Sequence, residues 1–333
     1  MTLPRLPAGV VRNACLCLSL AGCGGIQSAL APGGEEADTV LDLFWTVTGI
    51  SVVGALLVIL VTSAALWGPA HWRAWIGRDR VVIGGGIVVP VVVLSLLLFY
   101  GLFILQAGAA RTREADGPGI TVIGKRWWWR VVYTGPDGEQ VVSANELRLP
   151  AGRAVSVRMK SDDVIHSFWA PRLGGKLDMV PGRTNVLTLK ATEPGVSRGQ
   201  CAEYCGGAHA LMAFYVVALP EKDYAVWLAN EAGPARQPAT GEQRLGQQLF
   251  IASGCGGCHA IRGTAAAGTI GPDLTHVGGR MSLAGAILPN DAEAFARWIA
   301  DNQHIKPDNL MPPFRQFEES ELRAVATYLE SLK

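Results

Sequence analysis

Two long stretches of this sequence, residues 41–67 and 81–105, are almost entirely apolar and nearly free of charge. An α-helix rises about 1.5 Å per residue, so about 20 helical residues cross the hydrocarbon core of a bilayer. A helical hairpin buried in a soluble protein is the alternative, but neither stretch has the polar face that such helices normally show. The sequence therefore predicts a transmembrane helical hairpin over residues 41–105, with Pro90 as a candidate kink in its second helix.

The flanks of the two stretches predict their orientation. The connection between them contains Arg73, Arg78 and Arg80, whereas the segment 23–40 contains acidic residues and no Lys or Arg. Short loops rich in Lys and Arg remain in the cytoplasm. The connection is therefore predicted to face the cytoplasm, and the segment 23–40 and everything after residue 105 are predicted to lie outside.

Residues 1–22 have the pattern of a cleaved signal peptide. Two arginines precede a short apolar run that ends in Leu20-Ala21-Gly22-Cys23, and this run is too short to cross a bilayer. The segment resembles a bacterial lipoprotein signal, in which cleavage leaves Cys23 as the lipid-bearing first residue. An uncleaved tail is the alternative. Together with the two predicted membrane helices and their orientation, this segment predicts a multi-pass protein of the bacterial inner membrane with its large domains on the extracytoplasmic side.

The composition excludes some functions. With 49% hydrophobic and 17% charged residues, the chain of 333 residues is too apolar for an ordinary soluble enzyme and too long for one small domain. Its formal net charge of +1, without a long run of Lys or Arg, argues against a nucleic-acid partner. Three of the seven cysteines, Cys15, Cys17 and Cys23, lie near the start of the chain, and the other four form two close pairs in its second half. Structural disulfides are the alternative, but the close pairs in the second half come with histidines at ligand spacing.

Residues 106–230 contain short β-rich segments separated by Gly and Pro. The predicted strands are residues 120–123, 127–133, 140–142, 154–159, 184–189 and 214–219. This spacing predicts an antiparallel sandwich or a Greek-key barrel. Rigid strands of such a domain can hold metal ligands that the loops supply.

One loop of this region is rich in soft metal ligands. It contains Cys201, Cys205, His209 and Met212, and His166 stands at the end of a separate strand. Thiolate sulfur combined with imidazole favours copper or zinc. Two Cys and two His would satisfy tetrahedral zinc, so zinc remains an alternative on ligand chemistry alone.

The region around this loop resembles cytochrome c oxidase subunit II. The resemblance extends over Ser161–Phe168, Lys176–Arg183 and Gly199–Gly206, with His209 and Met212 in register. It implies a cupredoxin-like Greek-key β-barrel that holds a dinuclear copper centre, called CuA. The resemblance thereby favours copper over zinc.

The resemblance also implies a role for each ligand. Cys201 and Cys205 bridge the two copper ions, so that one electron spreads over both metals. His166 and His209 bind one copper ion each through imidazole. Met212 and the backbone carbonyl of Glu203 are weak axial ligands.

Two further residues receive a role from this resemblance. The Glu203 position also reaches a Mg²⁺ ion at the contact with subunit I, and a glutamate that lends only its carbonyl is the alternative. The position of Trp127, within Lys125–Arg130, is where electrons reach the copper centre. Packing in the core or at the membrane interface is the alternative for this tryptophan-rich segment.

A second metal motif, Cys255-Gly256-Gly257-Cys258-His259, lies in residues 241–333, after a polar linker at residues 231–240. In the c-type haem attachment pattern, the two thiols add to the haem vinyl groups and the histidine binds the iron. A zinc half-site is the alternative. Apolar faces at helix spacing before and after the motif resemble the crossing helices of an all-α class I cytochrome c.

The sixth ligand of the iron is predicted to be a methionine after the attachment motif. Met281 and Met311 are the candidates, and we choose Met311 because Asn309-Leu310-Met311-Pro312-Pro313 resembles the ligand loop of class I cytochromes c. His276 and His304 are alternatives. An axial methionine opposite a histidine raises the reduction potential of the iron.

As a whole, the chain resembles subunit II of a caa-type cytochrome c oxidase, with a cytochrome c domain fused behind the copper domain. This implies that electrons pass from one covalent haem c to CuA and on to haem a in subunit I. Oxygen is reduced to water there, coupled to proton pumping, so no catalytic residue is expected in this chain. The implied partners are subunits I and III, membrane lipid, and an upstream cytochrome or quinol–cytochrome c reductase as donor.

Two other functions share part of this pattern. A CuA-containing subunit of a nitric oxide reductase would have the same copper loop. A membrane copper-delivery protein also uses two cysteines and a distant histidine, but it has no need for Met212, for a haem domain or for two transmembrane helices.

Overall fold

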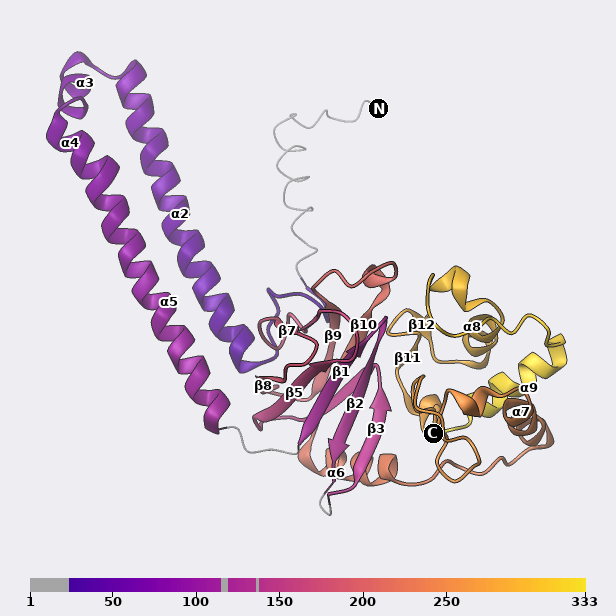
Figure 1. Ribbon diagram of the computed structural model, residues 1–333. Helices are drawn as coiled ribbons and strands as arrows, with labels where there is room; N and C mark the ends of the chain where they lie inside the picture. Colours follow the sequence, from indigo (N-terminus) through magenta and orange to yellow (C-terminus); the bar gives the residue numbers. More distant parts are fainter. Residues whose placement is uncertain (1–23, 115–118, 136–137) are drawn as a thin grey trace, which may run out of the picture. The chain divides into compact units, whose positions relative to one another are not determined.

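The apolar stretches form two long helices in the computed structural model, which describes residues 24–114, 119–135 and 138–333 (Figure 1). Helix α2 is Glu35–Trp67, and a second helical run comprises α4 (Asp79–Ile83), a π-helical turn η1 (Gly84–Val88) and α5 (Val89–Glu114). Both runs are long and apolar enough to cross a membrane. The predicted signal peptide and Cys23 lie outside the described residues.

The helices are longer than predicted. Helix α2 begins at Glu35 rather than at residue 41, and the second run begins at Asp79 rather than at residue 81. Acidic residues are favourable in a first helical turn, where the helix dipole is positive. The turn η1 lies just before Pro90, at the candidate kink, because proline has no N–H to donate to the carbonyl four residues earlier.

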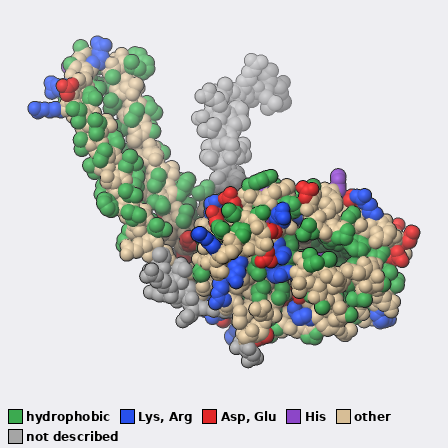
Figure 2. All heavy atoms as spheres, viewed as in Figure 1, with side chains coloured by type: hydrophobic (Ala, Val, Ile, Leu, Met, Phe, Trp, Pro, Cys, Tyr) green, Lys and Arg blue, Asp and Glu red, His purple; other side chains and the backbone are tan. Residues whose placement is uncertain are grey.

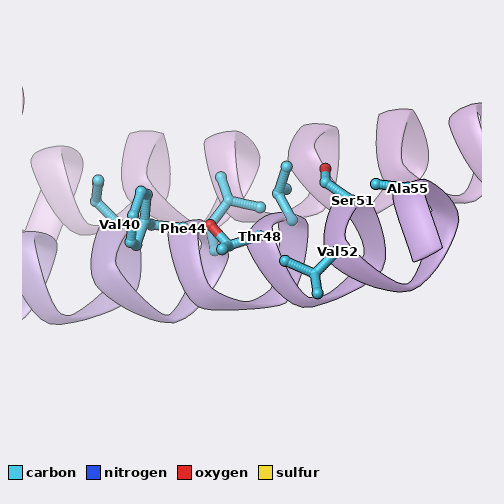
Figure 3. A pocket seen from close by; sticks show the side chains of 8 residues that line it. Val40, Phe44, Thr48, Ser51, Val52 and Ala55 are labelled. Carbon is cyan, nitrogen blue, oxygen red and sulfur yellow. The ribbon is translucent and has the colours of Figure 1, made fainter. Parts of the chain in front are cut away.

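The surface of these helices is apolar. Figure 2 shows hydrophobic side chains along both of them, with charged side chains gathered at the end that carries α4 and the short helix α3 (Ala70–Ile76). A shallow groove of about 580 Å³ follows one face of α2 between Val40 and Ala55 (Figure 3). Exposing so much apolar surface to water is unfavourable, as expected for helices that lie in lipid.

A second compact unit contains the described residues of 24–37 and 119–333. Its first part consists of two five-stranded sheets, with strand orders β3-β2-β1-β5-β8 and β4-β10-β9-β6-β7. The strands are β1 (Ile120–Lys125), β2 (Trp128–Thr134), β3 (Gln140–Ala144), β4 (Glu146–Pro150), β5 (Val155–Ser161), β6 (His166–Trp169), β7 (Leu177–Met179), β8 (Asn185–Leu189), β9 (Gly195–Cys201) and β10 (Ala213–Leu219). Side chains from both sheets form one core, which confirms the predicted sandwich.

Two features of the sheets differ from the prediction. Strands β4, β6, β7 and β9 were not predicted. The pairs β1–β5 and β4–β10 are parallel, whereas an antiparallel sandwich was expected. Residue alternation along a strand identifies its buried face but carries no information about the direction of its partner. Helix α6 (Glu221–Ala232) follows the last strand.

The last part of the chain is mainly helical. It contains α7 (Gly241–Ala252), α8 (Ala292–Ile305), α9 (Glu319–Glu330) and a short hairpin of β11 (Ser282–Leu283) and β12 (Leu288–Pro289). Helices α7 and α9 pack against each other, and at Gly246 an added side chain would collide with the carbonyl group of Ala324. The predicted pair of packed helices around the Cys255–His259 motif is therefore confirmed.

Candidate metal centres

The predicted copper ligands lie together in the structure. The sulfur atoms of Cys201 and Cys205 are 3.8 Å apart, and Nδ1 of His166 lies 3.9 Å from the first sulfur. Nδ1 of His209 lies 3.4 Å from Sγ of Cys205, and Sδ of Met212 lies 3.7 Å from it. The Glu203 carbonyl oxygen is 3.2 Å from Sγ of Cys201. All six predicted donors therefore form one cluster.

The strands and turns around the loop position these donors. His166 begins β6, and Cys201 ends β9, which pairs with β6. The backbone N–H of Cys201 donates to the carbonyl of Met212 at 2.9 Å and closes the loop. At Gly124, an added Cβ would lie 2.7 Å from Cδ2 of His166, so the close approach of β1 to the imidazole requires glycine.

Asp163 orients the first histidine. Its Oδ1 lies 2.7 Å from Nε2 of His166, and such a contact leaves Nδ1 as the free ligand atom. Burial opposes ionisation of Asp163, but hydrogen bonds from His166, Val164 and Arg126 lower its pKa overall. Burial likewise opposes protonation of His166, but its contacts with Cys201 and Asp163 raise its pKa overall.

The two thiols are electrostatically coupled. A hydrogen bond from Cys205 lowers the pKa of Cys201 to about 3, despite burial, while the same shared proton raises the pKa of Cys205. Protein groups alone thus stabilise one thiolate of the pair, and ionising both requires a nearby cation. A metal bound between the sulfurs would provide that charge.

The donor set fits copper better than zinc. Structural zinc takes four ligands, which the two Cys and two His could supply. The fully buried thioether of Met212 and the Glu203 carbonyl add two donors beyond that number, and a thioether is a ligand typical of copper. The carboxylate of Glu203 is partly exposed and lies 3.8 Å from Nζ of Lys176.

The haem attachment motif borders a large cavity. The cavity has a volume of about 1010 Å³ and is lined by Cys255, Cys258, His259 and Met311 together with apolar side chains. That volume is at the upper end for ligand-binding pockets. The other candidates for the sixth ligand, Met281, His276 and His304, do not border this cavity of the described chain.

The two predicted axial residues are held firmly. Nδ1 of His259 lies 2.7 Å from the carbonyl oxygen of Pro272, and burial lowers the pKa of this histidine, so that a neutral imidazole presents Nε2 to the cavity. The backbone N–H of Met311 donates to Oδ1 of Asn309 at 2.9 Å, and Gln303 donates to the Met311 carbonyl at 3.1 Å.

One buried cation in this cavity has an unsatisfied donor. Nε of Arg280 is buried and has no hydrogen-bond partner among the described residues. A buried donor without a partner is costly. An anionic group such as a haem carboxylate would satisfy this donor, so the cavity fits haem in charge as well as in its attachment cysteines.

The copper domain supplies one wall of the haem cavity. Trp127, with its neighbours Lys125, Arg126 and Trp128, lines the cavity. Trp127 is 6% exposed, and its indole Nε1 donates to the backbone carbonyl of Cys205 at 2.9 Å. The sequence placed Trp127 on a strand, whereas in the structure this residue directly precedes β2. A single side chain therefore touches the copper loop and borders the haem cavity.

The comparisons with known proteins agree with this geometry. Residues 136–219 match the periplasmic domain of cytochrome c oxidase subunit II, and residues 243–333 match cytochrome c. The chain is 35% identical to cytochrome c oxidase subunit 2 of Alkalihalophilus pseudofirmus, over 96% of this chain and 95% of that protein. The chain belongs to the cytochrome c oxidase subunit II family. Subunit 2 of Bacillus subtilis is 30% identical, and the match covers 95% of each chain.

The chain is also similar to a solved structure of a subunit II domain. The periplasmic domain of subunit II of cytochrome oxidase from Bradyrhizobium japonicum is 32% identical to this chain, with a TM-score of 0.33. That match covers 35% of this chain and 94% of the solved one.

Membership of the subunit II family has direct consequences. The chain is a membrane subunit of a haem–copper terminal oxidase, an oxidoreductase, and it associates with other oxidase subunits such as subunit I. Its subunit II domain implies CuA copper, and its cytochrome c domain implies haem c. A copper-delivery protein is no longer supported.

Sequence reasoning assigned no role to three residues at these sites. Asp163 lies in the quoted segment before His166 but was given no contact with it. Arg280 and Lys306 are basic residues that sequence analysis normally places at the surface. Only the fold shows that both line the haem cavity.

Proposed function

We propose that this subunit passes electrons from haem c to the dinuclear CuA centre and on to haem a of subunit I, where oxygen is reduced to water and protons are pumped. The observation that supports this most directly is the position of Trp127, which lines the haem cavity and donates to the Cys205 carbonyl. When bound, the copper pair shares one electron over two metals, so its bond lengths change little on reduction. We infer that the chain's own residues hold both centres and contribute no oxygen chemistry.

We assign the metal-binding roles as follows. Cys201 and Cys205 would bridge the coppers, and the remaining cluster donors would complete their coordination: His166, His209, Met212 and the carbonyl of Glu203. Cys255 and Cys258 would attach one haem, with His259 and Met311 as axial ligands. The exposed carboxylate of Glu203 would reach a Mg²⁺ ion shared with subunit I.

We also propose a domain arrangement and a side of the membrane. Residues 106–230 would form the copper domain, 231–240 the linker and 241–333 the haem domain. The end of α6 at Ala232 and the start of α7 at Gly241 support these boundaries. Both domains and a lipidated Cys23 would lie on the extracytoplasmic side, because the arginines cluster between the two membrane helices.

Further partners are proposed on the same grounds. We infer contact with subunit III in addition to subunit I. An upstream cytochrome or a quinol–cytochrome c reductase would deliver electrons to the haem domain, since Trp127 is buried and cannot meet a soluble donor directly.

Turnover of the purified complex tests this function. With reduced soluble cytochrome c as donor, we expect steady consumption of oxygen and no reduction of nitric oxide under anaerobic conditions. The same preparation without donor is the control. Rapid nitric oxide reduction with little oxygen consumption would contradict the proposal and favour the nitric oxide reductase alternative.

A further inference from the structure

We propose that Lys306 of the haem domain is a positioning residue for electron transfer between the two metal centres. It would hold the main chain of Trp127 in place from the haem side. This inference rests on the proposed electron relay and names a residue that controls its internal step.

Lys306 ties together three segments that are far apart in the sequence. It directly follows α8, and its side chain is 3% exposed. Its Nζ donates to the carbonyl of Trp127 at 2.8 Å and to the carbonyl of Ala284, in the turn between β11 and β12, at 2.7 Å. The amine therefore links the copper domain to the hairpin of the haem domain.

These bonds fix Trp127 at two points. Lys306 holds its backbone carbonyl, and the copper loop accepts a hydrogen bond from its indole through the Cys205 carbonyl at 2.9 Å. Both Lys306 and Trp127 line the haem cavity. Two hydrogen bonds, joined through the covalent structure of Trp127, thus connect Lys306 in the cavity wall to a predicted copper-bridging residue.

Stability alone does not account for a buried lysine at this place. Among the described residues Lys306 forms no salt bridge, and both of its hydrogen-bond partners are backbone carbonyls, although the thiol of Cys205 is near enough to interact with it electrostatically. Burial lowers the pKa of Lys306 to about 7, which reflects the cost of taking the ammonium group out of water. An apolar side chain of similar length would avoid this cost, but it would leave the carbonyls of Trp127 and Ala284 without the donor that Lys306 supplies.

Other contacts hold the two domains together independently of Lys306. Oε2 of Glu146, a buried residue of β4, accepts a hydrogen bond from the backbone of Met281 at 2.8 Å. Arg148 donates to the carbonyl of Gly279 at 3.2 Å, and Arg130 donates to the carbonyl of Thr269. Loss of the Lys306 bonds should therefore disturb Trp127 without detaching the haem domain.

The test measures haem-to-copper transfer directly in the complete purified oxidase. Haem c is reduced by a flash with a photoexcited ruthenium complex, and its reoxidation is followed optically. Lys306→Met, which removes both donors, is expected to slow reoxidation by about tenfold, because small displacements of positioned groups can cost up to about 100-fold. The haem absorption and the near-infrared copper band should remain unchanged.

Three further variants sharpen this experiment. Lys306→Arg keeps N–H groups that can donate to the same carbonyls. It should therefore return the rate to within about threefold of the wild type. Lys160→Met makes the same substitution at an exposed position of β5 and should change nothing. Trp127→Phe removes the indole donor at the other end of the chain of bonds and should slow the same step.

Several results would overturn the inference. A wild-type rate in Lys306→Met would show that the two hydrogen bonds are not needed. A rate in Lys306→Arg as slow as in Lys306→Met would show that N–H donors at this position do not support the step. Loss of either absorption band in Lys306→Met would mean that this residue only maintains the fold. Absence of haem-to-copper transfer in the wild type would instead refute the proposed relay itself.

Discussion

Replacement of Cys205 by serine is expected to abolish the near-infrared band of the copper centre and to leave the covalent haem in place. Sγ of Cys205 lies within 3.8 Å of Cys201 Sγ, His209 Nδ1 and Met212 Sδ, at the middle of the donor cluster. Losing an outer-shell partner alone costs about 10–100-fold in metal affinity, so loss of a bridging thiolate should cost more than about 100-fold. Copper analysis and the optical spectrum of the variant measure this effect.

A matched control is Ala202→Ser, which introduces the same hydroxyl group into the same loop without removing a sulfur atom. It should keep both the copper and the band. A Cys205→Ser protein that retained two coppers and the near-infrared band would contradict the assignment of this cysteine as a bridging ligand.

Met311→Ala is expected to change the spectrum of the reduced haem and to lower its reduction potential. Met311 is the one candidate for the sixth ligand that borders the haem cavity in the described chain. Axial ligands tune haem potentials over about 0.8 V, so loss of the thioether should lower the potential by more than about 100 mV. Spectroelectrochemistry of the purified complex gives both readings.

Met281→Ala serves as the control for this variant. Met281 is 44% exposed and its side chain does not border the cavity, so its removal should leave spectrum and potential unchanged. If Met281→Ala shifted the spectrum while Met311→Ala did not, Met281 would be the ligand and the predicted ligand loop would be wrong.

Both metal-binding motifs could be recognised in the sequence because most of their residues are close together in the chain, although His166 and Met311 lie far from them. Cys201 to Met212 form one loop, and in Cys255–His259 the spacing itself fits haem attachment. The membrane helices were equally predictable, because long apolar runs without charge leave few alternatives. Only their ends differ, since helix boundaries depend on local capping and on contacts outside the run.

Strands β6 and β9 could not be predicted for a specific reason. The buried side of β9 consists of Ser197, Gly199 and Cys201, small or polar residues, because the ring of Phe214 fills the space beside Gly199. Strand β6 begins with the buried polar residues His166 and Ser167. The apolar alternation that marks a strand is missing from both.

Long-range contacts of polar residues could not be predicted from the sequence either. Lys306 is buried only because the carbonyls of Trp127 and Ala284 converge on it. No local pattern distinguishes such a lysine from one at the surface. The burial of Trp127 beneath the haem domain likewise depends on the packing of two domains and not on its neighbours in sequence.

One polypeptide is expected to carry both a copper pair and a covalent haem. Metal analysis of the purified complex, together with its near-infrared spectrum, tests this expectation, with covalent haem counted on the denatured chain. We expect two coppers of a mixed-valence centre and one covalent haem per chain. A single colourless ion bound by Cys201 and Cys205, without the near-infrared band, would contradict the account.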